Sequence, residues 1–263
     1  MINFCTLFSG SSGNCTFITD QKTNIMVDAG RSGSSIQASL KNVGQSIENI
    51  DAILVTHEHV DHIRGIGILS RKYDIPVYAN NNTWAAMTDI LGEINQNNVR
   101  VFDTNNAFEI GNIGIKAFDI PHDAAEPVGY SFHIGAKKVT TATDVGHITE
   151  GLFENLKNSD ILLIESNHDV EMVKVSRYPY FLKQRILGKH GHLSNDSAGK
   201  LICELVEHGI SRVLLGHLSK ENNFPELCYQ TVANILEEKG IKIGKDIKME
   251  VALRDKESII YAV

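Results

Sequence analysis

The sequence predicts an α/β fold in which two mixed β-sheets pack face to face and helices cover their outer sides. Short β-rich segments come first in meanders and then alternate with helical segments, and this order occurs in both halves of the chain. No Pro/Gly-rich linker or low-complexity segment divides the 263 residues. We therefore expect a single domain that spans residues 1–263.

The first half of the chain opens with a meander of three strands, bounded by residues that favour turns, and then alternates helices with strands. The expected strands are Ile2–Leu7, Cys15–Thr19, Asn24–Val27, Ala52–Val55, Val77–Ala79 and Val99–Phe102. The expected helices are Ser35–Asn42, Ile63–Tyr73 and Thr83–Leu91. Each strand lies next to a helix or a turn, as in layered α/β folds.

The second half repeats this order. The expected strands are Ile113–Asp119, Gly129–Ile134, Lys138–Ala142, Ile161–Glu165, Val213–Gly216, Lys248–Leu253 and Ser258–Val263. A helix is expected at Ile148–Asn155. Ser194 is a predicted N-cap, because the apolar residues that follow it keep helical spacing, and Pro225 stands where the first turn of another helix would place it.

Composition and charge limit the function classes. Hydrophobic residues make up 42% and charged residues 22% of the chain, as in globular proteins. The net charge of −7 disfavours wholesale nucleic-acid binding, so that role needs a local basic patch. The four cysteines form no CxxC pair, which argues against a cysteine zinc site. No secretory signal pattern and no long apolar run occur, so we expect a cytoplasmic protein without membrane contact.

The run HEHVDH, residues 57–62, holds three histidines and an aspartate directly after an expected strand. His57 and His59 are two apart, so in extended backbone their side chains point the same way. Asp61 and His62 come after the chain turns toward a helix and can face a neighbouring position. This spacing allows two metal ions, and imidazole with carboxylate suits Zn, Mn or Fe. The alternative is a solvated polar loop, which the flanking strand and helix disfavour.

Three more residues of ligand type follow apolar strands. His122, Asp144 and His217 each lie just past the carboxyl end of an expected strand, which is where open α/β sheets place their sites. Each one alone is more often an ordinary loop residue. Together with the run at 57–62 they complete a dinuclear site, so we expect two divalent metal ions, Mn or Zn, with Fe as a third option.

The order of these residues resembles the ligand order of metallo-β-lactamase-fold hydrolases, and the resemblance extends over essentially the whole chain. It includes Asp28, which matches an early aspartate that braces the site. Four segments resemble the YycJ/WalJ branch of this family, namely FSGSSGN at 8–14, ESNHD at 165–169, GHLSN at 191–195 and LGHLS at 215–219. The resemblance implies a four-layer αββα sandwich. It also implies a cytoplasmic, metal-dependent exonuclease that degrades double-stranded DNA from the 5′ end, with a link to DNA repair or cell-wall signalling.

The resemblance assigns each candidate ligand a role. The residues that resemble the first metal's ligands are His57, His59 and His122. Those that resemble the second metal's ligands are Asp61, His62 and His217, and Asp144 resembles a bridging carboxylate. In the expected mechanism a hydroxide between the metals attacks the phosphodiester, because metal binding lowers the pKa of water toward about 7. Asp61 is then also catalytic, because it orients this hydroxide.

A proton donor for the leaving oxygen is also expected. His192 is our candidate acid, with Glu165 as the carboxylate that orients it. This pair resembles a Glu and a His in the tRNA-processing relatives of the fold. The alternative is that His192 only caps the helix that begins near Ser194. His168 lies near a ligand motif, and we expect it to contact the substrate or to support a ligand.

The segment from Met172 to His190 contains five Lys or Arg residues, no Asp or Glu, and three interleaved aromatic residues. Such a segment beside the metals can grip phosphates and stack bases. Arg177, Lys183 and Arg185 are therefore candidates for binding DNA, the expected partner. The alternative is a solvated helix face whose aromatic side lies in the core.

Three functions remain open from the residues. The first is a DNA exonuclease. The second is a hydrolase of small phosphodiesters or thioesters, which would use the same ligands. The third is a non-catalytic regulatory protein that keeps its metals for structure, and the intact ligand set argues against it because a regulator needs no open metal position. The residues carry no signal for the oligomeric state.

Overall fold

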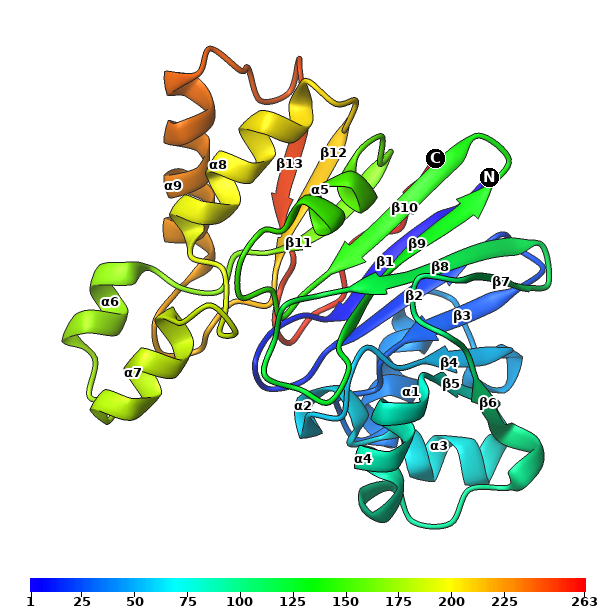
Figure 1. Cartoon of the computed structure of the whole chain (residues 1–263). Helices are drawn as coiled ribbons and strands as arrows, with labels where there is room; N and C mark the ends of the chain where they lie inside the picture. Colours follow the sequence, from blue (N-terminus) through cyan, green and yellow to red (C-terminus); the bar gives the residue numbers. More distant parts are fainter.

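The computed structural model describes residues 1–263 as two seven-stranded sheets packed face to face (Figure 1). In spatial order, the first sheet contains β14 (Tyr261–Ala262), β1 (Asn3–Phe8), β2 (Cys15–Thr19), β3 (Asn24–Val27), β4 (Ala52–Leu54), β5 (Val77–Ala79) and β6 (Val99–Val101). The second contains β13 (Lys248–Val251), β12 (Arg212–Gly216), β11 (Ile161–Glu165), β10 (Lys137–Ala142), β9 (Val128–Ile134), β8 (Ile113–Asp119) and β7 (Ala107–Ile110). Each sheet joins an antiparallel meander to a parallel part.

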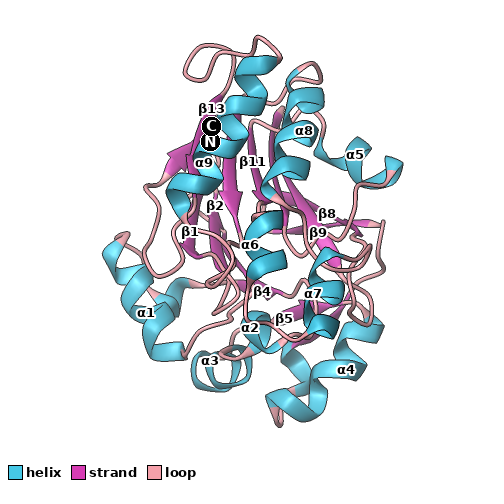
Figure 2. Ribbon diagram, turned by 90° about the vertical axis from the view of Figure 1, so that its left-hand side faces the viewer, coloured by secondary structure: helices cyan, strands magenta, loops and turns pink.

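Helices cover the outer face of each sheet (Figure 2). Those on the side of the first sheet are α1 (Gly33–Asn42), α2 (Val60–Ile63), α3 (Ile66–Tyr73) and α4 (Asn81–Leu91), and those on the second are α5 (Glu150–Leu156), α8 (Asn195–Val206) and α9 (Pro225–Glu238). Two more, α6 (Val170–Val175) and α7 (Tyr180–Leu187), project beyond the layers (Figure 1). No helix combines the length and apolar character that a bilayer crossing requires.

Three apolar cores separate the four layers. One lies between the sheets and includes Phe4 from β1 and Tyr130 from β9. The other two lie between each sheet and its helices, and Cys5 and Leu7 belong to the one on the side of the first sheet. Phe4 and its neighbour Cys5 thus enter different cores, because successive side chains of a strand point to opposite faces. The αββα architecture follows from this alternation, and the predicted fold class is confirmed.

Most predicted elements coincide with observed ones to within two or three residues. The helix predicted at Ile63–Tyr73 begins later, as α3 at Ile66, and the separate short helix α2 ends at Ile63. Between them Gly65 packs closely against the chain, since a Cβ there would lie 2.5 Å from the carbonyl oxygen of Arg31. The strand predicted at Ser258–Val263 is shorter and covers only β14. The elements β7, α6 and α7 were not predicted. The expectation of a single domain gains support from the core that both sheets share.

The parallel strands bring the ends of distant segments to one edge of the sandwich. In the first sheet Val27 is in register with Leu54, so the loops after β3 and β4 begin side by side. In the second sheet Ala142 is in register with Ile164, and Glu165 with Gly216. The residues that follow β10, β11 and β12 therefore also begin at one level, next to the loops of the first sheet.

Candidate metal centre and active site

The loop after β4 carries two imidazoles that face each other. Nε2 of His57 lies 3.0 Å from Nδ1 of His59. His122, from the loop after β8, adds a third ring, whose centroid is 5.2 Å from that of His57 and 5.1 Å from that of His59. One ligand atom from each of the three lies within 4.8 Å of the others. Three imidazoles that converge without a carboxylate among them fit a shared cation.

A second group lies beside the first. Asp61, His62 and His217 also place their ligand atoms within 4.8 Å of one another. Asp144 lies between the groups, with Oδ1 3.4 Å from Nε2 of His217 and 3.7 Å from Nε2 of His122. Its Oδ2 is 3.2 Å from Nε2 of His62. The structure therefore brings all seven predicted ligands together, and the carboxylate of Asp144 reaches both groups, as a bridging ligand must.

Three residues of the site have left-handed backbone conformations within two residues of the carboxyl end of a strand. Their φ angles are 60° for Asp28, 59° for Asp144 and 54° for His217. Such a conformation costs a non-glycine residue about 1–3 kcal/mol and persists where the surrounding structure enforces it. At His217 the backbone N–H donates to Oγ of Ser9 at 2.9 Å, which fixes the turn. The sharp turns direct these side chains into the site instead of along the strand.

Asp28 braces the second group without facing the cations itself. Its carboxylate accepts hydrogen bonds from the backbone N–H and the hydroxyl of Thr56, each at 2.9 Å, and lies 2.8 Å from Nδ1 of His62. A carboxylate on Nδ1 sets the tautomer that leaves Nε2 free to bind a metal. Thr56 was not predicted as a site residue, although its position next to His57 could have pointed to it.

The Gly/Ser-rich turn at 10–14 links the ligands that the two sheets contribute to the second group. Nδ2 of Asn14 lies 3.0 Å from Nε2 of His62, and its Oδ1 lies 3.2 Å from Nδ1 of His217. Its backbone N–H donates to the carbonyl oxygen of Asp61 at 2.8 Å. This approach requires Gly30, since a Cβ there would lie 1.7 Å from the same oxygen. The turn thus contacts both halves of the second group.

Glu165, at the end of β11, is fully buried and holds His192. Its Oε1 lies 2.8 Å from Nδ1 of His192, and its Oε2 accepts from the backbone N–H groups of Val145 and Leu193. Burial by itself lowers the pKa of His192, but the carboxylates of Glu165 and then Asp144 outweigh it and raise that pKa to about 9. His192 therefore carries a proton at neutral pH, and Nε2 stays available to donate it.

Burial and charge set the protonation of the candidate ligands. Burial lowers the pKa of His57, His122 and His217, which favours the neutral ring that a metal requires. Burial alone would also lower the pKa of His62, but the nearby carboxylates, Asp144 first, raise it well above the usual value. In Asp144 burial opposes ionisation, yet His217 and His62 hold the pKa well below its ordinary value. The pocket thus favours the ionised form of the Asp144 carboxylate.

Two polar atoms show that the cluster fits cations. Nε2 of His122 and Oδ2 of Asp144 are buried and make no hydrogen bond. A buried polar atom left unpaired costs about 1–3 kcal/mol. Divalent cations at the two groups would satisfy both atoms, since neutral imidazole and ionised carboxylate are ligands for Zn and Mn. The donor set therefore fits the metal centre that the sequence predicts.

The basic candidates lie on α7 and the turn before it, and one of them, Arg185, reaches the cluster. Nε of Arg185 donates to Oδ2 of Asp123 at 2.5 Å, and Oδ1 of Asp123 lies 3.3 Å from Nε2 of His122. Lys183 donates to the carbonyl oxygen of Lys174 at 2.7 Å and so links α6 to α7. Arg177 is exposed on the turn between them. Asp123 was not predicted, although it directly follows a predicted ligand.

Two expectations for this region need correction. His168 is only 1% exposed, so as placed it cannot contact a substrate; its backbone instead bridges to Ser194. The interpretation that the aromatic side of this helix lies in the core is wrong. Tyr180 is 76% exposed and Phe181 is 73% exposed, and no residue of α7 is buried. The N-cap of α8 is Ser194, whose side chain accepts from the N–H of Ser197. His192 is not the cap residue, and its ring pairs with Glu165 instead.

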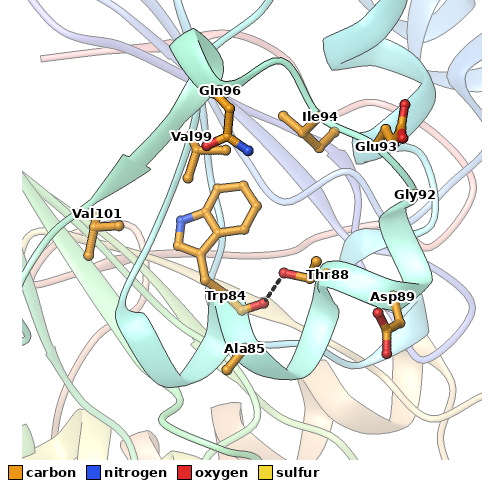
Figure 3. A pocket seen from close by; sticks show the side chains of 10 residues that line it. All are labelled: Trp84, Ala85, Thr88, Asp89, Gly92, Glu93, Ile94, Gln96, Val99 and Val101. Carbon is orange, nitrogen blue, oxygen red and sulfur yellow. Dashed lines mark hydrogen bonds between the residues drawn. The ribbon is translucent and has the colours of Figure 1, made fainter.

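A cavity of about 660 Å³ lies between α4 and β6 (Figure 3). Trp84 and Ile94 line it together with acidic Asp89 and Glu93, and no candidate metal ligand does. Trp84 is fixed there by a hydrogen bond from Nε1 to the carbonyl oxygen of Arg100 at 2.9 Å. The chemistry of the metal cluster therefore does not extend into this cavity.

Comparison with known proteins places these observations in a family. The model of the β-lactamase superfamily domain matches residues 23–218. Exodeoxyribonuclease YycJ of Bacillus anthracis is 39% identical over 244 residues, which cover 93% of this chain and 92% of that protein. Exodeoxyribonuclease WalJ of Streptococcus pneumoniae is 39% identical over 248 residues, or 94% of this chain and 92% of that one.

Solved structures share the fold at low sequence identity. The metallo-β-lactamase fold protein YhfI of Bacillus subtilis superposes with a TM-score of 0.75 at 15% identity and covers 100% of both chains. Zinc-bound PqqB of Methylobacterium extorquens gives a TM-score of 0.73 at 18% identity, with 97% of this chain and 99% of that chain covered. These two structures support the αββα architecture alone.

Proposed function

The chain belongs to the β-lactamase superfamily and, within it, to the YycJ/WalJ family, and we propose that it is a metal-dependent exodeoxyribonuclease. The observation that carries the proposal is the convergence of seven ligand-type side chains, with Asp144 between two groups of three. The names of the two relatives at 39% identity supply the substrate class.

The site residues take separate roles in this proposal. His57, His59 and His122 would hold one divalent ion, and Asp61, His62 and His217 the other, with Asp144 shared. Bound there, the two ions would polarise a phosphoryl oxygen and make a nucleophilic hydroxide available at neutral pH. Asp61, at the exposed rim of the cluster, orients the attacking group. Asp28 and Asn14 keep the imidazole nitrogens directed at the cations.

His192 supplies the proton for the leaving oxygen. Its Nδ1 is engaged by Glu165, which leaves Nε2 as the donor. The imidazole ring lies beside those of His122 and His217, with centroids 5.1 Å and 5.5 Å away, so the donor stands at the cluster where the ester bond would break. Glu165 touches no substrate in this scheme and acts as the orienting group for His192.

The finer features of the activity belong to the same proposal. The metals are Mn or Zn, with Fe as a further option, because the donor set mixes imidazole with carboxylate. The substrate is double-stranded DNA degraded from the 5′ end, with Arg177, Lys183 and Arg185 against its phosphates. A cytoplasmic location and a role in DNA repair follow from the family resemblance.

An end-labelled DNA assay tests the proposal. Purified protein, loaded with Mn or with Zn, is given duplex and single-stranded DNA labelled at either end, with an acyl thioester and a small phosphodiester as controls. We expect release of short products from 5′-labelled duplex and no thioester hydrolysis. Hydrolysis of the small esters with DNA left intact would refute the nuclease, and no hydrolysis at all would favour a regulatory protein.

A further inference from the structure

The surface of α7 carries two aromatic side chains whose exposure the fold does not require. Tyr180 and Phe181 are 76% and 73% exposed, on a helix in which no residue is buried. Leu182 and Ile186, one turn apart, are half-buried and form the inner face. Phe181 points outward instead. Large apolar side chains gathered on a surface mark contact sites.

The position of Phe181 relative to Arg185 places the aromatic face next to the metal cluster. The two residues are four apart and therefore lie on one face of α7, separated by about 6 Å along its axis. Arg185 reaches Asp123, which adjoins His122 of the cluster. The carboxyl end of α7 is also fixed to the site, since the N–H of His192 donates to the carbonyl oxygen of Ile186 at 3.1 Å. A chain that leaves the cluster along Arg185 meets Phe181 next.

The charge of the exposed face of α7 indicates which kind of partner binds there. The segment from Met172 to His190 has five basic residues and no acidic one, in a chain with a net charge of −7. Lys174 pairs with Glu171 and Arg185 with Asp123, both outside the segment, and the other three basic residues form no ion pair. In a two-fold dimer across this face, the same Lys and Arg residues of a second copy would oppose the first set, which is repulsive. A polyanion is attracted, and exposed aromatic rings between cations are the usual platform for unpaired bases. The surface is therefore complementary to a nucleic-acid strand and not to itself.

We infer that Tyr180 and Phe181 stack the unpaired bases at a DNA end while Arg185 holds the adjoining phosphate beside the metals. Base pairing and stacking hide the base faces inside a duplex, so only a frayed end or an overhang presents them. Neither aromatic residue is needed for the hydrolytic chemistry. The pair instead makes the enzyme select ends with unpaired nucleotides. This inference rests on the proposed nuclease function and narrows its substrate to DNA with such ends.

Binding to matched DNA ends tests the inference. The metal-loaded protein is titrated with two fluorescent duplexes made resistant by phosphorothioate linkages. Both are closed by the same hairpin loop at one end, and they differ only at the other end, which is a single-stranded overhang in one and blunt in the other. For Tyr180→Ala and Phe181→Ala we expect about a tenfold weaker Kd for the overhang DNA and less than a twofold change for the blunt one. Phe181→Trp, which keeps a stacking surface, should restore the parent's preference.

A spectroscopic readout and a matched control accompany the titration. Fluorescence of 2-aminopurine in the overhang should be quenched by the parent and not by a variant that combines Tyr180→Ala with Phe181→Ala. Ile259→Ala removes a side chain of similar exposure, 68%, away from α7 and should change nothing. Equal weakening on both duplexes, or none, would overturn the inference, as would altered sedimentation in place of altered binding. A parent that neither binds nor cuts DNA would instead refute the proposed function.

Discussion

The metal cluster and the neighbouring surface of α6 and α7 differ in burial, in backbone conformation and in what holds their side chains. Most of the cluster residues are buried. Two of them, Asp144 and His217, have left-handed backbone conformations that direct their side chains into the cluster. The surface of α7 has no buried residue and two short ion-pair or hydrogen-bond links, at Arg185 and Lys183. Chemistry that needs fixed distances is built into the core, whereas a contact with a long polyanion is built on a solvated helix.

The largest effect is expected at the centre of the cluster. Asp144→Ala should lower DNA hydrolysis by at least about 100-fold, because even outer contacts of a metal ligand contribute that much and Asp144 adjoins both groups. Metal content measured by mass spectrometry should fall in parallel. Asp89→Ala, an exposed aspartate on α4, is the matched control. Full activity with unchanged metal content in Asp144→Ala would show that the buried cluster is not the reaction centre.

Replacing the proposed proton donor, His192, should give the second-largest effect. His192→Ala should reduce kcat by roughly 10²- to 10⁴-fold with metal content retained. The pKa of about 9 means that His192 holds its proton below that pH, so parental activity should decline as the pH rises through it. Glu165→Gln removes the carboxylate that raises this pKa, and the decline should move to lower pH. A pH profile of Glu165→Gln that overlays the parental one would exclude His192 as the donor.

Replacing Asp28, which braces His62 from behind the cluster, should have a smaller effect. Asp28→Asn keeps the volume of the side chain but replaces the carboxylate that sets the tautomer of His62. Metal affinity, measured by competition with a chelator, should drop about 10- to 100-fold. Saturating metal should restore most of the activity. If the affinity of Asp28→Asn equals that of the parent, the second group does not depend on this contact.

The smallest effect is expected when the basic residues on the exposed surface of α7 and the turn before it are replaced. Neutralising Arg177, Lys183 and Arg185 together should leave metal content unchanged and flatten the salt dependence of DNA binding, by about one unit of slope for each phosphate that is no longer neutralised. The control triple replaces three exposed lysines near β13, namely Lys242, Lys245 and Lys248. An equal change of slope in both triples would show that net charge, and not this surface, attracts DNA.

The ligands could be found from the sequence because each follows an apolar strand at a shared edge. Val27, Ala142 and Gly216 lie at the ends of regular strands, and the register of the parallel strands brings the residues that follow them to one edge. Local sequence cannot show that Asp144 lies between two groups, because that position depends on side chains from both sheets. The partners Thr56 and Asp123 were missed although each adjoins a predicted ligand in the sequence.

The elements that were missed lack the signals on which prediction depends. In α6 the sequence VEMVKV has β-branched residues at three of six positions, which favour strands, and its helix is fixed by the Asp169 side chain accepting from the N–H of Met172. In α7 no residue is buried, so no clear apolar stripe marks it. β7 is a short edge strand. None of these three elements is therefore marked by a strong apolar period in the sequence.

Anomalous diffraction from metal-loaded crystals tests the central claim most directly. We expect two ions per chain, one among His57, His59 and His122 and one among Asp61, His62 and His217, with the Asp144 carboxylate between them. A single ion, or ions bound outside these two groups, would contradict the proposed dinuclear centre.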